Sequence, residues 1–184
     1  WKIFSKKLFK VTCPTLKTYN YLKEKNIFKE DQLEILYDPI IDISNFKGKK
    51  REVLNFDILK NKKFIISIGR LTKQKNFQLL VRFFEKIRNK NLDLVILGIG
   101  EDEIKLKNMV KKLRINDQVH FLGHQENVFK FLVNAECFIL TSLWEDPGFV
   151  IVEAGISNTA VISSDCPNGP NEIIGNNGFL FKNN

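Results

Sequence analysis

Apolar residues alternate between two arrangements from residue 64 onward. Residues 64–68 and 92–97 are short, mostly apolar runs that are followed by glycine, which is typical of strands buried on both faces of a sheet. Between these runs, residues 76–89 carry apolar side chains at helical spacing. Further strands are expected at 118–122, 137–140, 160–163 and 179–181, and further helices at 101–114, 126–134, 148–157 and 170–174. This alternation predicts an α/β fold with a Rossmann-like, doubly wound parallel sheet.

The first 63 residues lack this alternation and are predicted to form a separate, smaller part. Residues 1–46 are expected to be an appendage in which Thr15 caps a helix and Pro39 turns the chain at the end of a strand. Residues 47–63 are predicted to be a polar linker, in which the run from Lys47 to Arg51 can bury nothing. The domain that contains the sheet then spans residues 64–184.

Positive charge is concentrated in the N-terminal part. Residues 1–63 hold 15 of the 29 Lys and Arg residues but only 8 of the 21 Asp and Glu residues, so most of the net charge of +8 lies there. One interpretation is attraction to an anionic acceptor or membrane surface, with residues 1–10 making peripheral contact. The other is that these lysines form ordinary solvated surface. A nucleic-acid-binding module is disfavoured, because the charge lies outside the sheet domain and no nucleic-acid motif is present.

Several features of the sequence indicate a cytoplasmic protein. Cys13, Cys137 and Cys166 lie far apart and form no CxxC pair, which is typical of a reducing compartment. No apolar run approaches the roughly 18 residues of a membrane-spanning helix, and residues 1–7 do not resemble a signal peptide. Because the first residue is not Met, we expect the chain to be a fragment of a longer protein.

Ligands bind at the carboxyl ends of the strands in such sheets, so the loops after the predicted strands are candidate site segments. The first of these loops holds Arg70 and Lys75 just before a helix, where two cations suit a diphosphate. The alternative is that both are ordinary surface charges. The second loop holds Gly98 and Gly100, an incomplete dinucleotide fingerprint that a simple strand-to-helix turn also explains.

The loop after the strand at 137–140 carries the most chemistry. It holds Glu145 and Glu153, and the helix expected to start near Gly148 leaves the amides of Gly148, Phe149 and Val150 free to bind a phosphate. Because the helix around Glu153 is largely apolar, a carboxylate there needs a partner, and a ribose diol is a suitable one. The alternative for Glu153 is an ordinary helix surface residue.

These motifs together resemble glycosyltransferase family 4. In the order that this family shows, they are Gly69-Arg70 with Lys75, Gly98-Ile99-Gly100, Phe121-Leu122-Gly123, and Glu145 with Glu153. The resemblance implies a retaining enzyme of GT-B fold that needs no metal and no cofactor, and that uses a UDP- or GDP-linked sugar as co-substrate. It implies that the chain is the nucleotide-sugar-binding half of this fold.

The resemblance also implies a role for each matching residue. Arg70 and Lys75, with Gly69, would neutralise the diphosphate as it leaves, and the amides of residues 148–150 would hold the distal phosphate. Glu153 would bind the ribose and Glu145 the hydroxyls of the donor sugar. The base would lie near Gly98, Gly100 and Leu122.

The resemblance to family 4 further implies what lies outside the chain. Residues 1–46 would be the remnant of the N-terminal domain that binds a glycan or glycolipid acceptor, and the closing C-terminal helix would be missing. The variant Glu-Asp-Pro-Gly-Phe at 145–149 resembles members that act in bacterial envelope polysaccharide synthesis, which implies a role in lipopolysaccharide or capsule synthesis at the inner membrane face. A non-catalytic nucleotide-binding module remains the alternative. No metal site is expected, because His120 and His124 would diverge on a strand.

Overall fold

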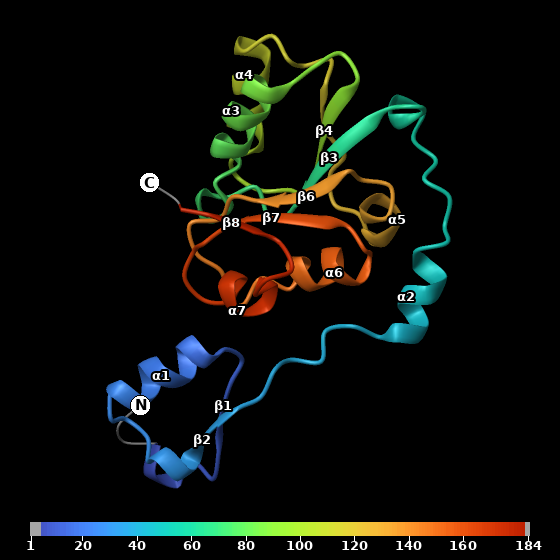
Figure 1. The fold of residues 1–184 in the computed structure, drawn as a ribbon. Helices are drawn as coiled ribbons and strands as arrows, with labels where there is room; N and C mark the ends of the chain where they lie inside the picture. The colour runs from blue at the N-terminus through green and yellow to red at the C-terminus, as the bar shows by residue number, and fades with distance from the viewer. Residues whose placement is uncertain (1–4, 183–184) are drawn as a thin grey trace.

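A computed structural model describes residues 5–182 of the chain. It contains a large α/β domain and a small N-terminal lobe, joined by a segment that runs along the side of the domain (Figure 1). The strands are β1 (Val11–Cys13), β2 (Leu33–Ile35), β3 (Lys63–Ile68), β4 (Leu92–Leu97), β5 (Val119–Phe121), β6 (Cys137–Leu140), β7 (Ala160–Ser164) and β8 (Phe179–Phe181). The α-helices are α1 (Leu16–Glu24), α2 (Ile43–Lys49), α3 (Phe77–Ile87), α4 (Glu103–Lys112), α5 (Phe129–Leu132), α6 (Val150–Ile156) and α7 (Pro170–Ile174).

The large domain is built on a six-stranded sheet in the order β5-β4-β3-β6-β7-β8, and every pair of neighbouring strands is parallel. In the central register, Ile66 of β3 lies between Val95 of β4 and Phe138 of β6. From β3 the chain adds β4 and then β5 on one side. It then returns and adds β6 on the other side of β3. This confirms the predicted Rossmann-like sheet, and it puts the change of direction between β3 and β6.

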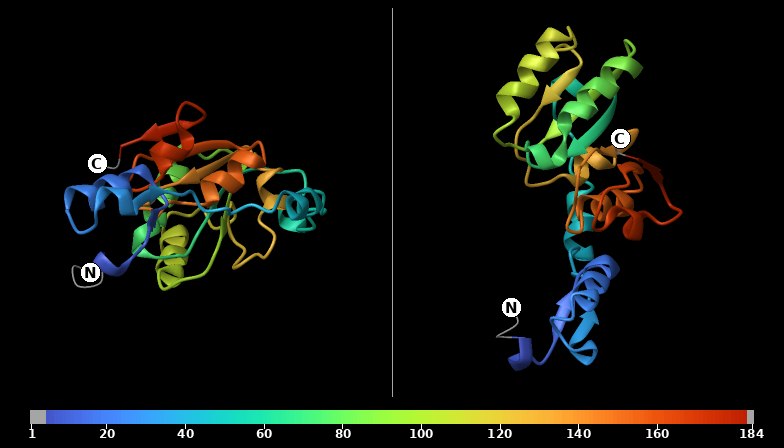
Figure 2. Two further views of the ribbon diagram at one scale, coloured as in Figure 1. Left: turned by 90° about the horizontal axis from the view of Figure 1, so that it is seen from below. Right: turned by 90° about the vertical axis from the view of Figure 1, so that its left-hand side faces the viewer.

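Helices cover both faces of this sheet (Figures 1 and 2). Ile66 and Val95 point to the face that packs against α5, α6 and α7, whereas Ile65 and Leu94 point to the face that packs against α3 and α4. This alternation follows from the two-residue period of a strand. It also explains why these strands are apolar at consecutive positions, since both faces are covered.

Some predicted helices are shorter in the structure. The helix expected at 76–89 is α3, which buries Phe77, Leu80 and Phe84 as its spacing predicts. The helix expected at 148–157 begins only at Val150, because the backbone of Gly148 has a φ of +92°, outside the helical region. Between residues 126 and 134 only α5 is helical.

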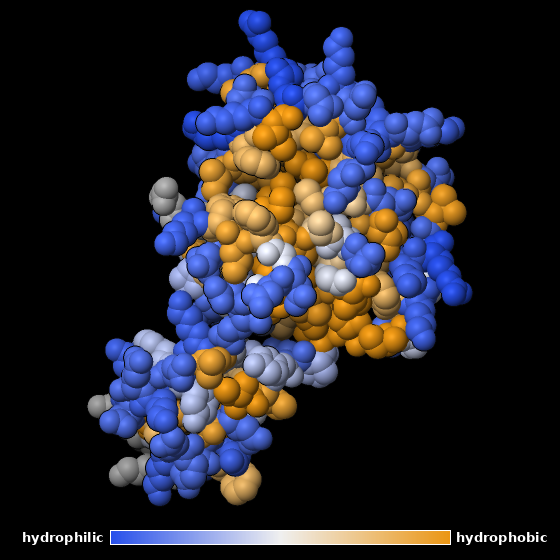
Figure 3. All heavy atoms as spheres, viewed as in Figure 1, coloured by the Kyte–Doolittle hydropathy of each residue, from blue (hydrophilic) through white to orange (hydrophobic). Residues whose placement is uncertain are grey.

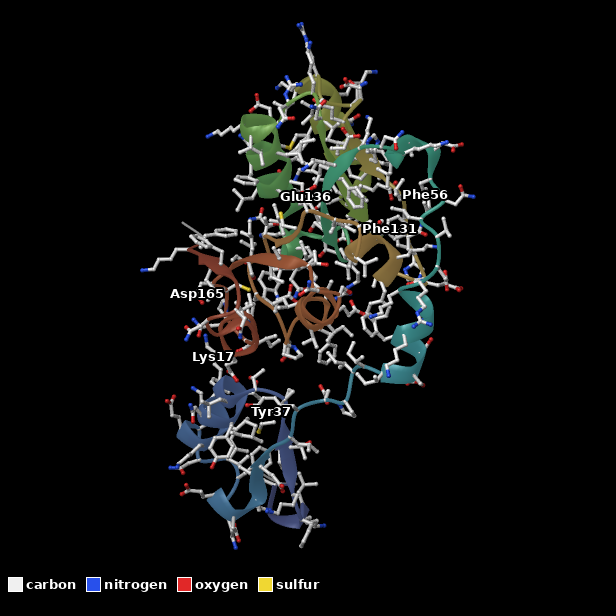
Figure 4. All side chains as sticks on the ribbon, turned by 45° about the vertical axis from the view of Figure 1, so that its right-hand side comes forward. Lys17, Tyr37, Phe56, Phe131, Glu136 and Asp165 are labelled. Carbon is white, nitrogen blue, oxygen red and sulfur yellow. The ribbon has the colours of Figure 1, made fainter. Side chains whose placement is uncertain are left out.

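Residues 47–51 have no buried side chain, whereas the rest of the predicted linker is not polar throughout. Leu59 is buried in the core of the large domain, and the Phe56 ring lies against Phe131, with centroids 5.1 Å apart (Figure 4). Just upstream, Phe46 on α2 contacts Phe129 at 5.0 Å. The few apolar residues of this segment are interspersed among charges, so they reach α5 and the sheet while the lysines face water.

The N-terminal lobe consists of α1 and the parallel pair β1 and β2. Thr15 caps α1 as predicted, since its hydroxyl accepts a hydrogen bond from the amide of Thr18. The expected strand end near Pro39 is displaced, because β2 ends at Ile35. Hydrophilic residues cover much of both lobes on the face shown, and hydrophobic residues gather mainly on the large domain (Figure 3). Of the predicted membrane contact at 1–10, residues 1–4 lie outside the described residues.

Candidate functional site

A cleft of about 580 Å³ lies at the carboxyl ends of β3 and β6, where the direction of the sheet changes. Three loops form it, those that follow β3, β6 and β7. Its lining residues are Ile68, Gly69, Arg70, Gln74, Lys75, Trp144, Glu145, Asp146, Gly148, Phe149, Val150 and Asn168. Seven of the eleven residues proposed from the sequence are therefore brought together here, and Gly98, Gly100, Leu122 and Glu153 are not among the lining residues.

The centre of the cleft is an ion pair between Lys75 and Glu145. The Lys75 ammonium nitrogen Nζ lies 2.6 Å from Glu145 Oε1 and 2.8 Å from Oε2. Both side chains are largely buried, with 14% and 4% of their surfaces exposed. A buried carboxylate or ammonium alone would be costly, so each stabilises the charge of the other. The sequence suggested separate roles for these residues, whereas the structure joins them in one group.

Hydrogen bonds fasten the β3 loop to the β6 loop around this pair. The Leu143 amide donates to the carbonyl of Gln74 at 2.8 Å, and the Gln74 side-chain amide donates to the carbonyl of Trp144 at 2.9 Å. The Thr141 hydroxyl donates to the Lys75 carbonyl at 3.0 Å. The backbone that carries Lys75 is therefore fixed relative to the loop that carries its partner.

The β7 loop supports the β6 loop from the other side. The amide of Glu145 donates to the carbonyl of Pro167 at 2.9 Å. Gly169 approaches the same loop so closely that a Cβ there would lie 1.8 Å from the carbonyl oxygen of Pro147. Only glycine fits such an approach, and it also adopts its φ of +124° without strain. Sequence reasoning missed this role of Gly169, whose signal was the Gly-Pro pair that opens α7.

Ser142 is a second residue that sequence reasoning missed. Its hydroxyl donates to Glu145 Oε1, and none of its surface is exposed. The residue lies two positions after the end of the apolar strand β6 and has no periodic signal. Its place three residues before a loop glutamate was the one feature that could have pointed to it.

The Gly98-Ile99-Gly100 turn packs beneath the β3 loop. A Cβ on Gly98 would lie 1.9 Å from the carbonyl oxygen of Gly69, and one on Gly100 would lie 2.4 Å from that of Leu71. The Leu71 amide also donates to the carbonyl of Ile99 at 2.9 Å. These glycines are therefore required for the close approach of two loops, and their contact with a donor stays a prediction.

The backbone amides of Gly148, Phe149 and Val150 belong to three residues that line the cleft at the start of α6. None of them donates a hydrogen bond to another residue within 5–182. The glycine is required at the first of these positions, because its φ is +92° and a Cβ would lie 3.2 Å from Glu145 Cγ. Unbonded donors beside two cations make this side of the cleft suitable for an anion.

Glu153 lies further along α6, outside the cleft lining, and is partly buried. Burial raises the pKa of its carboxyl, and the positive charge of Lys49 opposes this shift. Within the described part of the chain, no side chain or amide forms a hydrogen bond or ion pair with its carboxylate. A partly buried carboxylate without a bonded partner is ready to accept hydrogen bonds from a ligand. Leu122 packs against the same core cluster as α6, at the end of β5.

No group of three or more potential metal ligands occurs among the residues that the structure describes. His120 is buried against Asp93, with 2.7 Å between His120 Nε2 and Asp93 Oδ2, whereas His124 is exposed. The two histidines therefore do not share a site. Within residues 5–182, no helix combines the length and apolar character needed to span a bilayer.

The cleft geometry agrees with a match to the family model described as Glycosyl transferases group 1, which covers residues 49–184. The chain belongs to this family. An uncharacterised glycosyltransferase of Methanocaldococcus jannaschii is 43% identical over 120 residues, covering 64% of this chain and 30% of its own length. A Campylobacter jejuni relative, named as an N-acetylgalactosamine-N,N'-diacetylbacillosaminyl-diphospho-undecaprenol 4-alpha-N-acetylgalactosaminyltransferase, is 36% identical over 146 residues, with 79% of this chain and 38% of its own length covered.

Solved structures show the same fold at lower identity. TarM of S. aureus, crystallised with UDP among its ligands, superposes with a TM-score of 0.80 at 20% identity, covering 99% of this chain and 35% of its own. HepE of Anabaena, also crystallised with UDP, gives 0.78 at 18% identity, covering 95% and 50%. The expected membership of the GT4 group and the Rossmann-like half of a GT-B fold are thereby confirmed. The chain spans between a third and a half of these structures.

Proposed function

We propose that this chain is the donor-binding part of a retaining glycosyltransferase and that it holds a nucleotide-diphosphate sugar, linked to UDP or GDP, in the cleft between β3 and β6. The observation that carries the proposal is the composition of this cleft. Lys75, Arg70 and three residues whose amides form no hydrogen bond within 5–182 line one cavity at the change of direction of a parallel sheet. The chemistry of these groups matches an anionic diphosphate next to a polar sugar.

Arg70 and Lys75 have different roles in this proposal. Arg70 is exposed in the cleft and has no carboxylate partner among the described residues, so its full charge faces the diphosphate. Lys75 is held by Glu145 and adds a fixed, short-range donor. As the bond to the sugar breaks, negative charge grows on the diphosphate, and preorganised cations stabilise that charge. No metal is required in this proposal, because the two side chains supply the positive charge.

Glu145 and Glu153 bind the sugar and the ribose of the donor in this proposal. After its bonds to Lys75 and Ser142, Glu145 still has free lone pairs. These accept hydrogen bonds from hydroxyls of the sugar. Glu153 accepts hydrogen bonds from the ribose diol. The base lies toward Gly98, Gly100 and Leu122, at the ends of β4 and β5. UDP in the cited crystal structures supports a uridine nucleotide as the first ligand to test.

The wider context of the reaction is also part of the proposal. The Campylobacter jejuni relative, whose name includes a diphospho-undecaprenol glycan, supports a role in cell-envelope polysaccharide or glycolipid synthesis. A second relative, from Rhizobium meliloti, is named as a lipopolysaccharide core biosynthesis glycosyltransferase. The acceptor would bind through the N-terminal half of the whole protein, at the cytoplasmic face of the membrane.

Calorimetric titration of the chain with UDP and GDP tests the proposal. We expect one of them to bind, and we expect Glu153→Ala to weaken binding by at least about tenfold, the effect of losing hydrogen bonds to a charged group. Glu136→Ala is the matched control, because Glu136 is an exposed glutamate at the opposite end of β6 that pairs with Lys63. Equal binding by the Glu153→Ala variant, or no binding of either nucleotide at millimolar concentration, would contradict the proposed donor site.

A further inference from the structure

The Glu145 carboxylate is held by donors on two sides. Lys75 bonds to both of its oxygens, and the hydroxyl of Ser142 donates to Oε1. The Glu145 residue is only 3% exposed, although it lies in a loop with no regular secondary structure. Because water cannot orient such a group, its direction is set by these neighbouring side chains.

Ser142 is itself anchored to the sheet. It follows the end of β6 by two residues, and its surface is fully buried. The hydroxyl of Ser164, the last residue of β7, donates to the Ser142 carbonyl at 2.7 Å. The hydroxyl that orients Glu145 therefore comes from a point tied to two strands, so it does not move with the loop.

The geometry has a consequence for Lys75. A lysine ammonium has three donors, and two of them are directed at the Glu145 oxygens, which leaves the third for a ligand in the cleft. If the carboxylate rotates, the ammonium that follows it changes direction as well. Groups that support a binding residue in this way determine how well it is preorganised.

We propose that Ser142 is a positioning residue, which orients the Glu145 carboxylate and through it directs the Lys75 ammonium toward the donor diphosphate. This inference rests on the proposed function for its ligand. The arrangement of the three side chains can be tested without any ligand.

The ligand-free test is nitrogen-15 NMR of the lysine ammonium groups in the 184-residue chain. Wild type should give a protected Nζ signal for Lys75, assigned by its loss in Lys75→Arg. The signal should disappear or shift to the position of solvent-exposed lysines in Ser142→Ala. Ser163→Ala is the matched control, because Ser163 is also a fully buried serine near the end of β7, but within residues 5–182 its hydroxyl bonds only to the Ser164 carbonyl. An unchanged Lys75 signal in a folded Ser142→Ala protein would overturn the proposal.

The second test compares affinity for UDP and UMP. Ser142→Ala should lower the preference for UDP by about tenfold and leave UMP affinity nearly unchanged, whereas Ser163→Ala should alter neither. A general loss of structure would instead lower the affinity for UDP and for UMP together. Ser164→Ala, which removes the anchor but keeps the Ser142 hydroxyl, should give a smaller loss and serves if Ser142→Ala does not fold.

The outcomes separate the two proposals. If wild type binds UDP and Ser142→Ala keeps the wild-type preference for UDP over UMP, the positioning role is wrong and the donor site stands. If wild type binds neither nucleotide, the proposed function is contradicted, and the NMR signal of Lys75 alone decides whether Ser142 positions the pair.

Discussion

Two buried carboxylates at opposite ends of the sheet each bind a lysine, yet only one of them lies in a cleft. At the carboxyl ends of the strands, Glu145 pairs with Lys75 beside a cavity of about 580 Å³. At the amino ends, Asp93 Oδ2 accepts from Lys62 at 2.8 Å and contacts His120 at 2.7 Å. The chemistry of the two clusters is similar, so a buried ion pair does not by itself mark a functional site.

The surroundings of the two clusters explain the difference. Asp93 is 1% exposed, and its lysine partner, Lys62, comes from the segment just before β3. Its second oxygen, Oδ1, is buried without a hydrogen-bond partner among the described residues. Glu145 instead lies under three loops that leave room for a ligand. In parallel sheets, the loops at the carboxyl ends form such space, whereas the amino ends are closed by short connections.

The largest expected effect comes from removing the lysine of the cleft. Lys75→Met leaves Glu145 buried and uncompensated, which we expect to lower the free energy of unfolding by about 3 kcal/mol. UDP affinity should fall by at least about a hundredfold, since a charge-assisted contact to phosphate is lost as well. Urea unfolding and calorimetric titration measure the two effects. The matched variant is Lys62→Met, which should retain wild-type UDP affinity, and an equal loss of affinity in both variants would remove the contrast between the clusters.

A smaller effect, confined to stability, is expected at the amino ends of the strands. Asp93→Ala removes the bonds to Lys62 and His120 and should lower the free energy of unfolding by about 2 kcal/mol. The Lys62 side chain is 40% exposed and can turn to water, which limits the cost. UDP binding by the folded fraction should not change. Chemical denaturation and titration of the same sample check both statements, and weaker UDP binding would show that this cluster is coupled to the cleft.

A third prediction concerns pH and Glu153. Because burial raises the pKa of its carboxyl, the folded chain binds more protons than the unfolded chain above the ordinary value of 4.5. The free energy of unfolding therefore decreases as the pH rises from 4.5 through the raised pKa. Glu153→Gln should abolish this decrease, a difference of less than about 1 kcal/mol because water partly screens the group. Denaturation curves at several pH values test this, with Glu136→Gln as the exposed control, and identical pH profiles for Glu153→Gln and wild type would contradict it.

The same contrast shows what the sequence could and could not predict. Continuous apolar runs such as 64–68 predicted the buried strands, because both faces of the sheet are covered. Arg70, Lys75 and Glu145 were found because strand ends in a parallel sheet meet at one edge. The pairing of Lys75 with Glu145 was not found, since these residues are 70 positions apart and their contact depends on loop backbone.

The features that the sequence did not predict have a common physical cause. Phe56 and Leu59 are embedded in charged sequence, so their burial depends on the tertiary surface that they meet and not on local periodicity. The late start of α6 depends on the backbone of Gly148, which no apolar pattern encodes. Ser142 orients a carboxylate through one hydroxyl, and serine is common in loops for many reasons.

The smallest effect we expect is optical, and it reports directly on the cleft. The sequence has two tryptophans, Trp1 and Trp144, and Trp144 lines the cleft with 47% of its surface exposed. In a Trp1→Phe chain, emission therefore comes from Trp144 alone. Because Trp144 lines the cleft, the exposure of its indole to water should change when a ligand fills the cleft.

Titration of the Trp1→Phe chain with a UDP-linked hexose should change the Trp144 emission by roughly a tenth or more as the indole is desolvated. Lys75→Met in this background should shift the curve to higher concentration, whereas Asp93→Ala should leave its midpoint unchanged. If Asp93→Ala moves the midpoint as far as Lys75→Met does, the two clusters are not independent. The ion pair of Asp93 with Lys62 would then affect ligand affinity through the sheet. The distinction between a structural and a binding ion pair would fail for this domain.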